Sequence, residues 1–191
     1  MADYVVLASG SGSNFEAIAT SCCLSGHRLL AVISDRREAP VLRRAERLGV
    51  PSLIVSYEAG RDRAESRLLD ALAKLEPDLI VLAGFMKILP SRIVERFRGH
   101  ILNIHPALLP GFPGRNAIKR AYAEPGAAMG ITVHFVDEGV DTGPVLARVE
   151  ADRSGDPGLE EMEARIHALE HHHYPRLIAE QLDAIGRATE R

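Results

Sequence analysis

The sequence predicts an α/β protein with a doubly wound, mostly parallel sheet, in a single domain spanning residues 1–191. Two observations predict this class: short, continuous apolar runs recur along the chain, and segments of helical periodicity separate them. Strands that are buried on both faces of a parallel sheet have this continuous apolar character. Alternating strands and helices with right-handed crossovers then build a sheet covered on both faces. The length suffices for one substantial core.

The strands are expected where apolar runs of four to eight residues lie between turn signals. The runs are residues 4–8, 29–33, 52–55, 79–83, 101–105, 129–136 and 145–149. Helices are expected between them, beginning after the glycine-rich turn that follows the first strand. The later helices are residues 40–48, 61–75, 91–97, 116–123 and a long C-terminal helix over 158–188, broken or bent near Pro175.

Composition and charge exclude several classes of protein. A net charge of -3 and a pI near 6.2, with basic residues scattered among acidic ones, give no electrostatic basis for binding nucleic acid or an anionic membrane. No apolar run approaches the ~20 residues of a membrane span, and no leader pattern precedes the first strand, so we expect a cytoplasmic protein. Cys22 and Cys23 are adjacent and are the only cysteines, so they cannot form a disulfide framework, and we expect both to be small apolar fillers at a helix end.

Two polar side chains interrupt the apolar run at 101–105. Asn103 and His105 are two residues apart, so on a strand they lie on one face, and Pro106 ends the strand just after them. Ligands of open α/β sheets bind at this carboxyl end. An amide that donates to a developing oxyanion, beside a group that titrates near neutrality, suits acyl transfer. The equal alternative is a strand end whose polar residues cap neighbouring loops.

A glycine-rich turn, residues 9–14, follows the first strand and precedes a helix. Glycines allow close approach of a ligand, and the free N–H groups of a helix start favour a phosphate group. The alternative is a plain N-cap at Ser13 or Asn14. A dinucleotide-binding fingerprint would need a third glycine at position 15, where the sequence has Phe15. The Gly-Lys-Ser/Thr of a P-loop is also absent. Asp35 lies where such a fingerprint would place a ribose-binding acid, although we favour a solvated loop charge there.

Three further segments bear on a site. The apolar loop 84–90 suits a flat heteroaromatic ring, with a core loop as the equal alternative. The glycine- and proline-rich turn 137–144 is rigid enough to hold Asp141 in one orientation. His134, inside the strand 129–136, is interpreted as a satisfied core residue. The consecutive histidines 171–173 point about 100° apart on a helix, so we expect no metal site.

Four segments, 9–14, 82–89, 103–106 and 136–144, occur in the order and spacing found in one family. With them the sequence resembles the phosphoribosylglycinamide formyltransferases, which are folate-dependent formyltransferases with a Rossmann-like fold, over nearly its whole length. The resemblance implies transfer of a formyl group from 10-formyltetrahydrofolate to the amine of glycinamide ribonucleotide in de novo purine biosynthesis. It implies no metal, and a monomer or homodimer with small-molecule substrates as partners.

The resemblance also implies roles for particular residues. Those implied to be catalytic are Asn103, His105 and Asp141, with Asn103 and His105 stabilising a tetrahedral intermediate and Asp141 raising the pKa of His105. Those implied to bind glycinamide ribonucleotide are Gly12, Ser13, Asn14 and Glu170. Those implied to bind the folate are Arg61, Met86, Lys87, Ile88, Leu89 and Asn103. The alternatives are a formyltetrahydrofolate hydrolase, or an NAD-type or non-catalytic nucleotide-binding protein.

Overall fold

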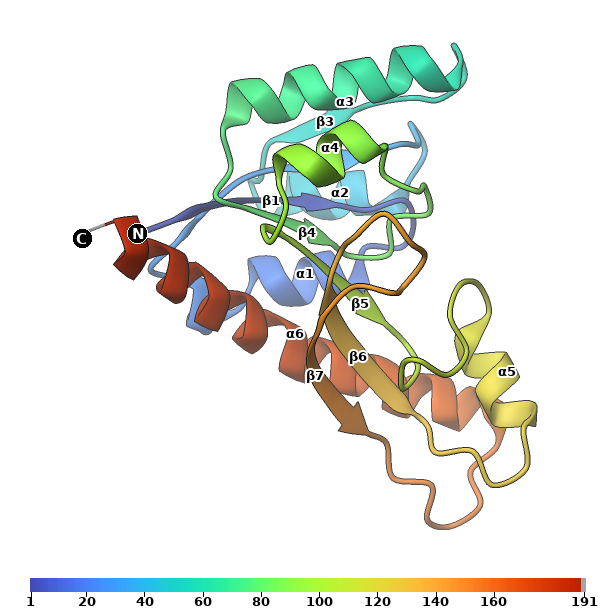
Figure 1. Cartoon of the computed structure of the whole chain (residues 1–191). Helices are drawn as coiled ribbons and strands as arrows, with labels where there is room; N and C mark the ends of the chain where they lie inside the picture. Colours follow the sequence, from blue (N-terminus) through green and yellow to red (C-terminus); the bar gives the residue numbers. More distant parts are fainter. Residues whose placement is uncertain (190–191) are drawn as a thin grey trace.

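A computed structural model describes residues 1–189 and shows one seven-stranded sheet in the order β3-β2-β1-β4-β5-β6-β7 (Figure 1). The strands from β3 to β5 pair in parallel, whereas β5–β6 and β6–β7 are antiparallel. The sheet is therefore mostly parallel, as the sequence predicts. The strands are β1 (Asp3–Leu7), β2 (Arg28–Ser34), β3 (Ser52–Ile54), β4 (Leu79–Leu82), β5 (Ile101–His105), β6 (Gly130–Phe135) and β7 (Val145–Glu150).

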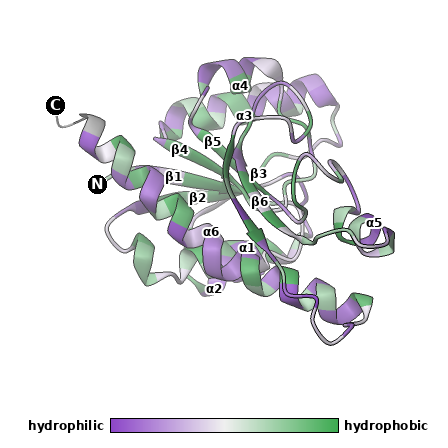
Figure 2. Cartoon of the chain, turned by 60° about the horizontal axis from the view of Figure 1, so that its bottom comes forward, coloured by the Kyte–Doolittle hydropathy of each residue, from purple (hydrophilic) through white to green (hydrophobic). Residues whose placement is uncertain are grey.

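Helices cover both faces of the sheet, as a doubly wound arrangement requires. Successive residues of β1 face opposite layers: Val6 packs in the apolar core beneath α1, α2 and α6, and Val5 packs in the core beneath α3 and α4. Figure 2 shows the apolar strands enclosed between the helices, whose outer faces are polar. The helices are α1 (Ser13–Ala19), α2 (Pro40–Arg47), α3 (Arg61–Leu75), α4 (Ser91–Arg96), α5 (Ala117–Ala123) and α6 (Leu159–Thr189), with a 3-10 turn η1 (Cys22–Leu24) after α1.

Helix α6 continues through Pro175, so of the two outcomes predicted there, a break or a bend, the break is absent. The preceding residue, Tyr174, is fully buried, and its hydroxyl lies 3.0 Å from the Leu82 carbonyl oxygen and 3.2 Å from that of Leu102. This anchor to β4 and β5, together with packing of α6 on α1, β6 and α5, compensates for the hydrogen bond that proline removes.

Two sequence expectations are wrong. Cys22 and Cys23 are both exposed on η1, so they fill no core position. Asp35 is buried, with 7% of its surface exposed, and its Oδ2 lies 3.9 Å from the Lys87 ammonium. A solvated loop charge at Asp35 is therefore excluded.

The strand order reverses between β1 and β4, which lie side by side although β2 and β3 intervene in sequence. The loops that leave these two strands meet at the carboxyl edge of the sheet. Ser9 joins them: its N–H donates to the Gly84 carbonyl oxygen at 3.1 Å, and its hydroxyl accepts the Met86 N–H at 2.8 Å. Such a switch point is where open α/β sheets bind ligands.

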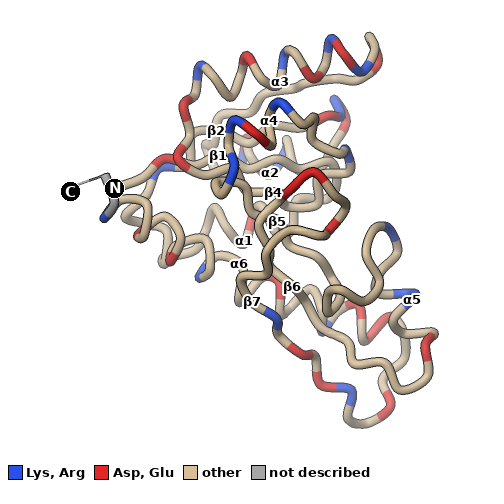
Figure 3. The backbone as a smooth tube through the Cα atoms, in the orientation of Figure 1, with Lys and Arg blue, Asp and Glu red and all other residues tan. Residues whose placement is uncertain are grey.

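Charges of both signs are interspersed over the fold, as α3 illustrates (Figure 3). Among the described residues, no helix is both long enough and apolar enough to span a membrane.

Candidate active site

A cleft of about 1040 Å³ opens at the carboxyl ends of β1, β4 and β5. Four loops form its walls: the glycine-rich loop after β1, the apolar loop after β4, the proline-rich loop after β5 and the turn between β6 and β7. The amino-terminal part of α6 closes one side. The polar residues that line it include Ser13, Asn14, Lys87, Asn103, His105, His134, Asp141, His167 and Glu170.

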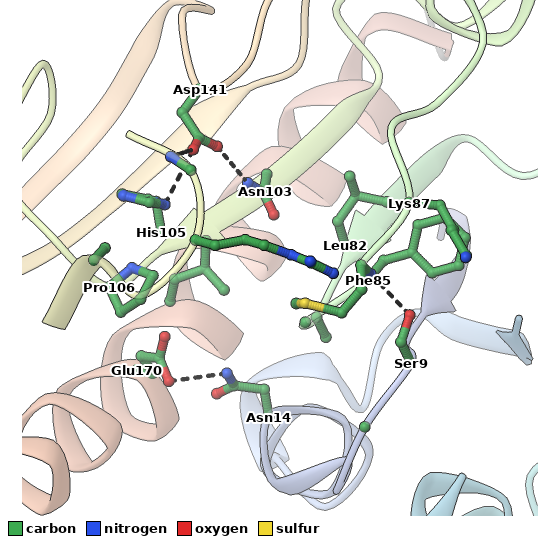
Figure 4. A pocket seen from close by; sticks show the side chains of 18 of the residues that line it. Ser9, Asn14, Leu82, Phe85, Lys87, Asn103, His105, Pro106, Asp141 and Glu170 are labelled. Carbon is green, nitrogen blue, oxygen red and sulfur yellow. Dashed lines mark hydrogen bonds and ion pairs between the residues drawn. The ribbon is translucent and has the colours of Figure 1, made fainter. Parts of the chain in front are cut away.

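Asn103, His105 and Asp141 converge in this cleft, although Asp141 is 36 or more residues away along the chain (Figure 4). The Asn103 Nδ2 donates to Asp141 Oδ1 at 3.3 Å. The His105 Nδ1 lies 3.3 Å from the other carboxylate oxygen, Oδ2, which also accepts the Gly114 N–H at 2.7 Å. An amide, an imidazole and a carboxylate thus meet at one edge of the sheet.

Local backbone structure fixes the orientation of each member. The alternation of β5 places Asn103 and His105 on the same face. Asp141 has a φ of 56°, in the left-handed region that few non-glycine residues adopt. Two glycines make its turn possible: a Cβ at Gly143 would lie 1.9 Å from the Phe135 carbonyl oxygen, and one at Gly139 would lie 2.0 Å from the hydroxyl of Thr142. The rigid turn expected around Asp141 is present.

The surroundings of Asp141 favour its ionised form. A hydrogen bond from the His134 imidazole in its protonated form, the Gly114 N–H and the charge of His105 together lower the pKa of Asp141 to about 2, against an opposing effect of partial burial. Asp141 is consequently a carboxylate throughout the neutral range. It can stabilise a positive charge beside it.

His105 has hydrogen-bond acceptors near both ring nitrogens. Its Nε2 lies 2.9 Å from the Phe112 carbonyl oxygen, and its Nδ1 faces Asp141. A carbonyl oxygen only accepts, so the Nε2 carries a hydrogen here. The doubly protonated imidazolium satisfies both contacts, and the chemistry available at this point is donation of a proton or of a charge-assisted hydrogen bond.

His134 is buried, as expected, but it is not merely a core residue. Its Nε2 lies 3.1 Å from Asn103 Nδ2 and 3.5 Å from Asp141 Oδ1, so it contacts two of the three converging side chains. The pairing of β5 with β6 places His134 directly opposite Asn103. Only this antiparallel register reveals the contact, and nothing in the local sequence indicates the register.

The glycine-rich loop forms the polar arm of the cleft, where Gly12, Ser13 and Asn14 lie. Gly12 has a φ of 78°, and a Cβ there would lie 2.6 Å from Val41 Cγ2, so only glycine fits. The Asn14 Nδ2 donates to Glu170 Oε2 at 3.1 Å, while Asn14 Oδ1 is buried and has no hydrogen-bond partner among the described residues. Such an atom is suited to accept a hydrogen bond from a bound ligand.

Glu170 is itself buried, with 4% of its surface exposed, and connects α6 to the glycine-rich loop. His167, one helical turn earlier, has its Nδ1 2.9 Å from the same Glu170 oxygen. This hydrogen bond with Glu170 raises the pKa of His167, in spite of partial burial. His167 lines the cleft, and no sequence motif indicates it; only its position one helical turn before Glu170 on α6 does so.

The loop after β4 forms the apolar arm. Met86 and Ile88 are 56% and 62% exposed, which is unusual for large apolar side chains, whereas Leu89 is buried. Lys87 lies among them, with its Nζ 4.9 Å from the centre of the Tyr57 ring and opposite the carboxylate of Asp35. A flat apolar ligand would cover Met86 and Ile88, so the expected aromatic site is sterically reasonable.

Arg61 lies outside the main cleft, at the beginning of α3. It lines an adjoining pocket of about 240 Å³ that shares Ile88 and Leu89 with the cleft. Its guanidinium is exposed and pairs with Glu65 at 2.5 Å. Arg61 can thus meet only a ligand that extends out of the cleft past Ile88.

Comparison with known proteins identifies the family. Residues 2–178 match the family described as formyl transferase. The chain is 39% identical to the phosphoribosylglycinamide formyltransferase of Bacillus subtilis (strain 168), over 98% of each chain. It is 35% identical to the enzyme of that name in Escherichia coli (strain K12), over 92% of this chain and 84% of that one.

Solved structures agree with this relationship. The fold superimposes on glycinamide ribonucleotide transformylase 1 from Geobacillus kaustophilus with a TM-score of 0.90 and 39% identity, covering 95% of this chain and 99% of that one. The phosphoribosylglycinamide formyltransferase of Streptococcus pneumoniae TIGR4 gives a TM-score of 0.86 over 93% and 97% of the two chains, again at 39% identity. The resemblance that the four sequence motifs indicate is confirmed, and the chain belongs to the formyl transferase family.

Proposed function

We propose that this protein transfers the formyl group of 10-formyltetrahydrofolate to the amine of glycinamide ribonucleotide, a step of de novo purine biosynthesis. The names of the full-length relatives support this reaction. The observation that carries it is the meeting of Asn103, His105 and Asp141 at the junction of a polar and an apolar arm of one cleft.

The two arms suit the two substrates. In the polar arm, Gly12, Ser13 and Asn14 bind the phosphoribosyl group, and Glu170 faces the glycinamide end. The buried, unpartnered Asn14 Oδ1 supports this assignment, since a ligand hydroxyl or amine would satisfy it. The apolar arm binds the folate. The residues assigned to it are Met86, Lys87, Ile88, Leu89 and Asn103, with Arg61 beyond them for the charged tail of the folate.

In the reaction, the substrate amine attacks the formyl carbon, the bond from that carbon to the folate nitrogen breaks, and the amine proton ends on that nitrogen. Asn103 donates an amide hydrogen to the carbonyl oxygen as negative charge develops, a contribution typically of about 3 to 4 kcal/mol for one such donor. His105, as an imidazolium stabilised by Asp141, donates to the same oxygen. A water molecule held by His105 and Asp141 carries the proton from the attacking amine to the folate nitrogen. Alignment of two bound substrates supplies much of the remaining rate.

Proton donation by His105 requires its Nε2 or Nδ1 to exchange a protein acceptor for the substrate. The Phe112 carbonyl, 2.9 Å from Nε2, belongs to the loop that also contacts Asp141 through Gly114. We infer that this loop shifts when substrates bind, which frees one donor of His105. We also propose that the protein acts in the cytoplasm and needs no metal.

The test is an assay of formyl transfer with purified protein. We expect 10-formyltetrahydrofolate to be consumed only when glycinamide ribonucleotide is present, with formylglycinamide ribonucleotide as the product. Formate release without an acceptor would instead identify a hydrolase. NADH binding without folate binding would identify a nucleotide-binding protein of another class. Saturable folate binding that weakens in Arg61→Ala excludes the NAD-type and nucleotide-binding alternatives, while the dependence on glycinamide ribonucleotide separates the transferase from a hydrolase.

A further inference from the structure

We propose that His134 is a positioning residue for formyl transfer: as a neutral imidazole protonated on Nδ1, it fixes the amide of Asn103 with one N–H directed into the cleft. The role rests on the proposed function, since it concerns the donor that faces the reacting carbonyl. His134 is 2% exposed, lines the cleft and contacts Asn103 and Asp141.

The contacts of the two ring nitrogens define the tautomer. The His134 Nδ1 lies 2.8 Å from the carbonyl oxygen of Phe135, which can only accept a hydrogen bond, so Nδ1 carries the hydrogen. In a neutral ring the Nε2 then presents a lone pair. The Asn103 Nδ2, at 3.1 Å, is the donor that it faces.

Three distances determine where the amide hydrogens of Asn103 point. Asn103 Nδ2, His134 Nε2 and Asp141 Oδ1 form a triangle with sides of 3.1, 3.3 and 3.5 Å. The two acceptors therefore subtend roughly 65° at the amide nitrogen, whereas the two N–H bonds diverge by about 120°. A single N–H is shared between His134 and Asp141. The second N–H points away from both, and it has no other acceptor among residues 1–189.

The alternative orientation of the Asn103 amide is unfavourable. Rotating it by 180° would bring its oxygen against a carboxylate oxygen of Asp141 and against the lone pair of His134 Nε2. Two acceptors thus oppose the rotated state, and an unpaired buried oxygen would cost free energy. His134 adds to this selection because its Nε2, at 3.1 Å, is a second acceptor for the amide beside Asp141 Oδ1 at 3.3 Å.

A β-bulge lies beside His134. The pairing of β6 with β7 shifts between Val133 and His134, so that β7 contributes one extra residue at this point. Bulges of this kind redirect a side chain next to active sites. If the ring gained a second proton, its Nε2–H would donate to Asp141 Oδ1 at 3.5 Å and would oppose the N–H of Asn103. The neutral ring is therefore the form that positions the amide.

The first part of the test compares His134→Leu, Asn103→Ala and the double variant. We expect kcat to fall about tenfold or more in His134→Leu, with the KM for the folate nearly unchanged, because only the transition-state donor is misdirected. In the Asn103→Ala background the His134→Leu change should have no further effect. Additive losses, or an unchanged kcat in His134→Leu, would overturn the role. His27→Leu, which removes another buried histidine far from the cleft, is the matched control and should keep full activity.

The second part of the test requires neither an activity assay nor a variant. In the unmodified protein, 15N NMR of the histidine rings should show His134 with a protonated Nδ1 and an unprotonated Nε2 at neutral pH. The opposite tautomer, or an imidazolium, would overturn the positioning role even if formyl transfer is intact. Absence of formyl transfer in the unmodified protein would instead overturn the proposed function. The two failures are thus distinguishable, and a His134→Leu variant that failed to fold would still leave this part decisive.

Discussion

At the scale of single residues, Asp141 connects the parts of the site. Its two carboxylate oxygens receive contacts from Asn103, His105, His134 and the Gly114 N–H, which come from β5, β6 and the loop between β5 and α5. A carboxylate at this position both orients the amide and stabilises an imidazolium. Its substitution should therefore affect stability as well as turnover.

Asp141→Asn should lower the free energy of unfolding at pH 7 by about 2 kcal/mol, because the folded-state pKa is about 2 against an ordinary value of 3.8. A carboxyl group with a lowered pKa contributes stability above its unfolded-state pKa and loses this contribution as the pH falls through the folded-state value. Urea unfolding at several pH values should show the difference from the unmodified protein shrinking between about pH 4 and pH 2. The exposed Asp70 on α3 provides the control: Asp70→Asn should show no such dependence. A difference that is constant with pH would contradict the account.

Glu170→Gln should raise the KM for glycinamide ribonucleotide by about tenfold and leave the KM for the folate unchanged, because it removes the charged partner of Asn14 and His167. Steady-state kinetics with each substrate varied in turn measures both values.

The same variant should lower the pKa of His167, since Glu170 is the main cause of its elevation. An NMR titration of His167 reports this directly. Glu160→Gln, at the exposed start of α6, should change neither the kinetics nor the titration. A rise in the folate KM instead would mean that Glu170 belongs to the other arm.

At the scale of elements, the glycine-rich loop between β1 and α1 depends on close packing against α2. Gly12 is the critical residue, with a left-handed φ and with Val41 where a Cβ would lie. The neighbouring Gly10 has open space around it and an ordinary φ. Substituting each glycine in turn therefore distinguishes a steric requirement for glycine at one position from a general need for a flexible loop.

Gly12→Ala should cost about 2 kcal/mol of stability, from a strained backbone together with an overpacked contact, and should abolish binding of the phosphorylated substrate. Gly10→Ala should be close to neutral in stability. Chemical denaturation and calorimetric titration with glycinamide ribonucleotide measure the two effects. Equal stability losses in both variants would show that the contact with Val41 is unimportant.

In the loop after β4, one apolar side chain is open to a ligand and the next packs in the core, because Ile88 is exposed and its neighbour Leu89 is buried. Substituting each in turn therefore distinguishes ligand binding from core packing. Ile88→Ala should change stability by less than about 0.5 kcal/mol and raise the KM for the folate several-fold, since the ligand would cover this side chain. Leu89→Ala should instead lower stability by about 2 to 3 kcal/mol. Thermal unfolding together with folate kinetics distinguishes them. An unchanged folate KM in Ile88→Ala would remove this loop from the site.

At the scale of the whole molecule, local patterns predicted most of the architecture. The amphipathic helix Arg61–Leu75 has the predicted bounds, because its apolar stripe and end signals are all local. The strands of the parallel part lie within a residue or two of the apolar runs. The family resemblance implied that Asn103, His105 and Asp141 act together, whereas strand geometry alone did not. Because β6 runs antiparallel to β5, the turn that carries Asp141 begins beside the amino end of β5, where Phe135 pairs with Leu102.

What could not be predicted depends on contacts between distant segments. The antiparallel register that sets His134 opposite Asn103 comes from pairing across 31 residues. The burial of Asp35 depends on Lys87, from a different loop. Helix α6 passes through Pro175 because Tyr174, beside it, is anchored to two strand ends. In each case tertiary structure overrides a local tendency.

The central claim is that the Asn103 amide, supported by Asp141, stabilises the oxyanion of a formyl transfer. The most direct measurement is the single-turnover rate constant of Asn103→Ala, with both substrates saturating. The account predicts a loss of about 10²- to 10³-fold with a much smaller change in the dissociation constant of the folate, because the hydrogen bond from Asn103 is strongest in the transition state. A rate constant close to that of the unmodified protein would contradict it.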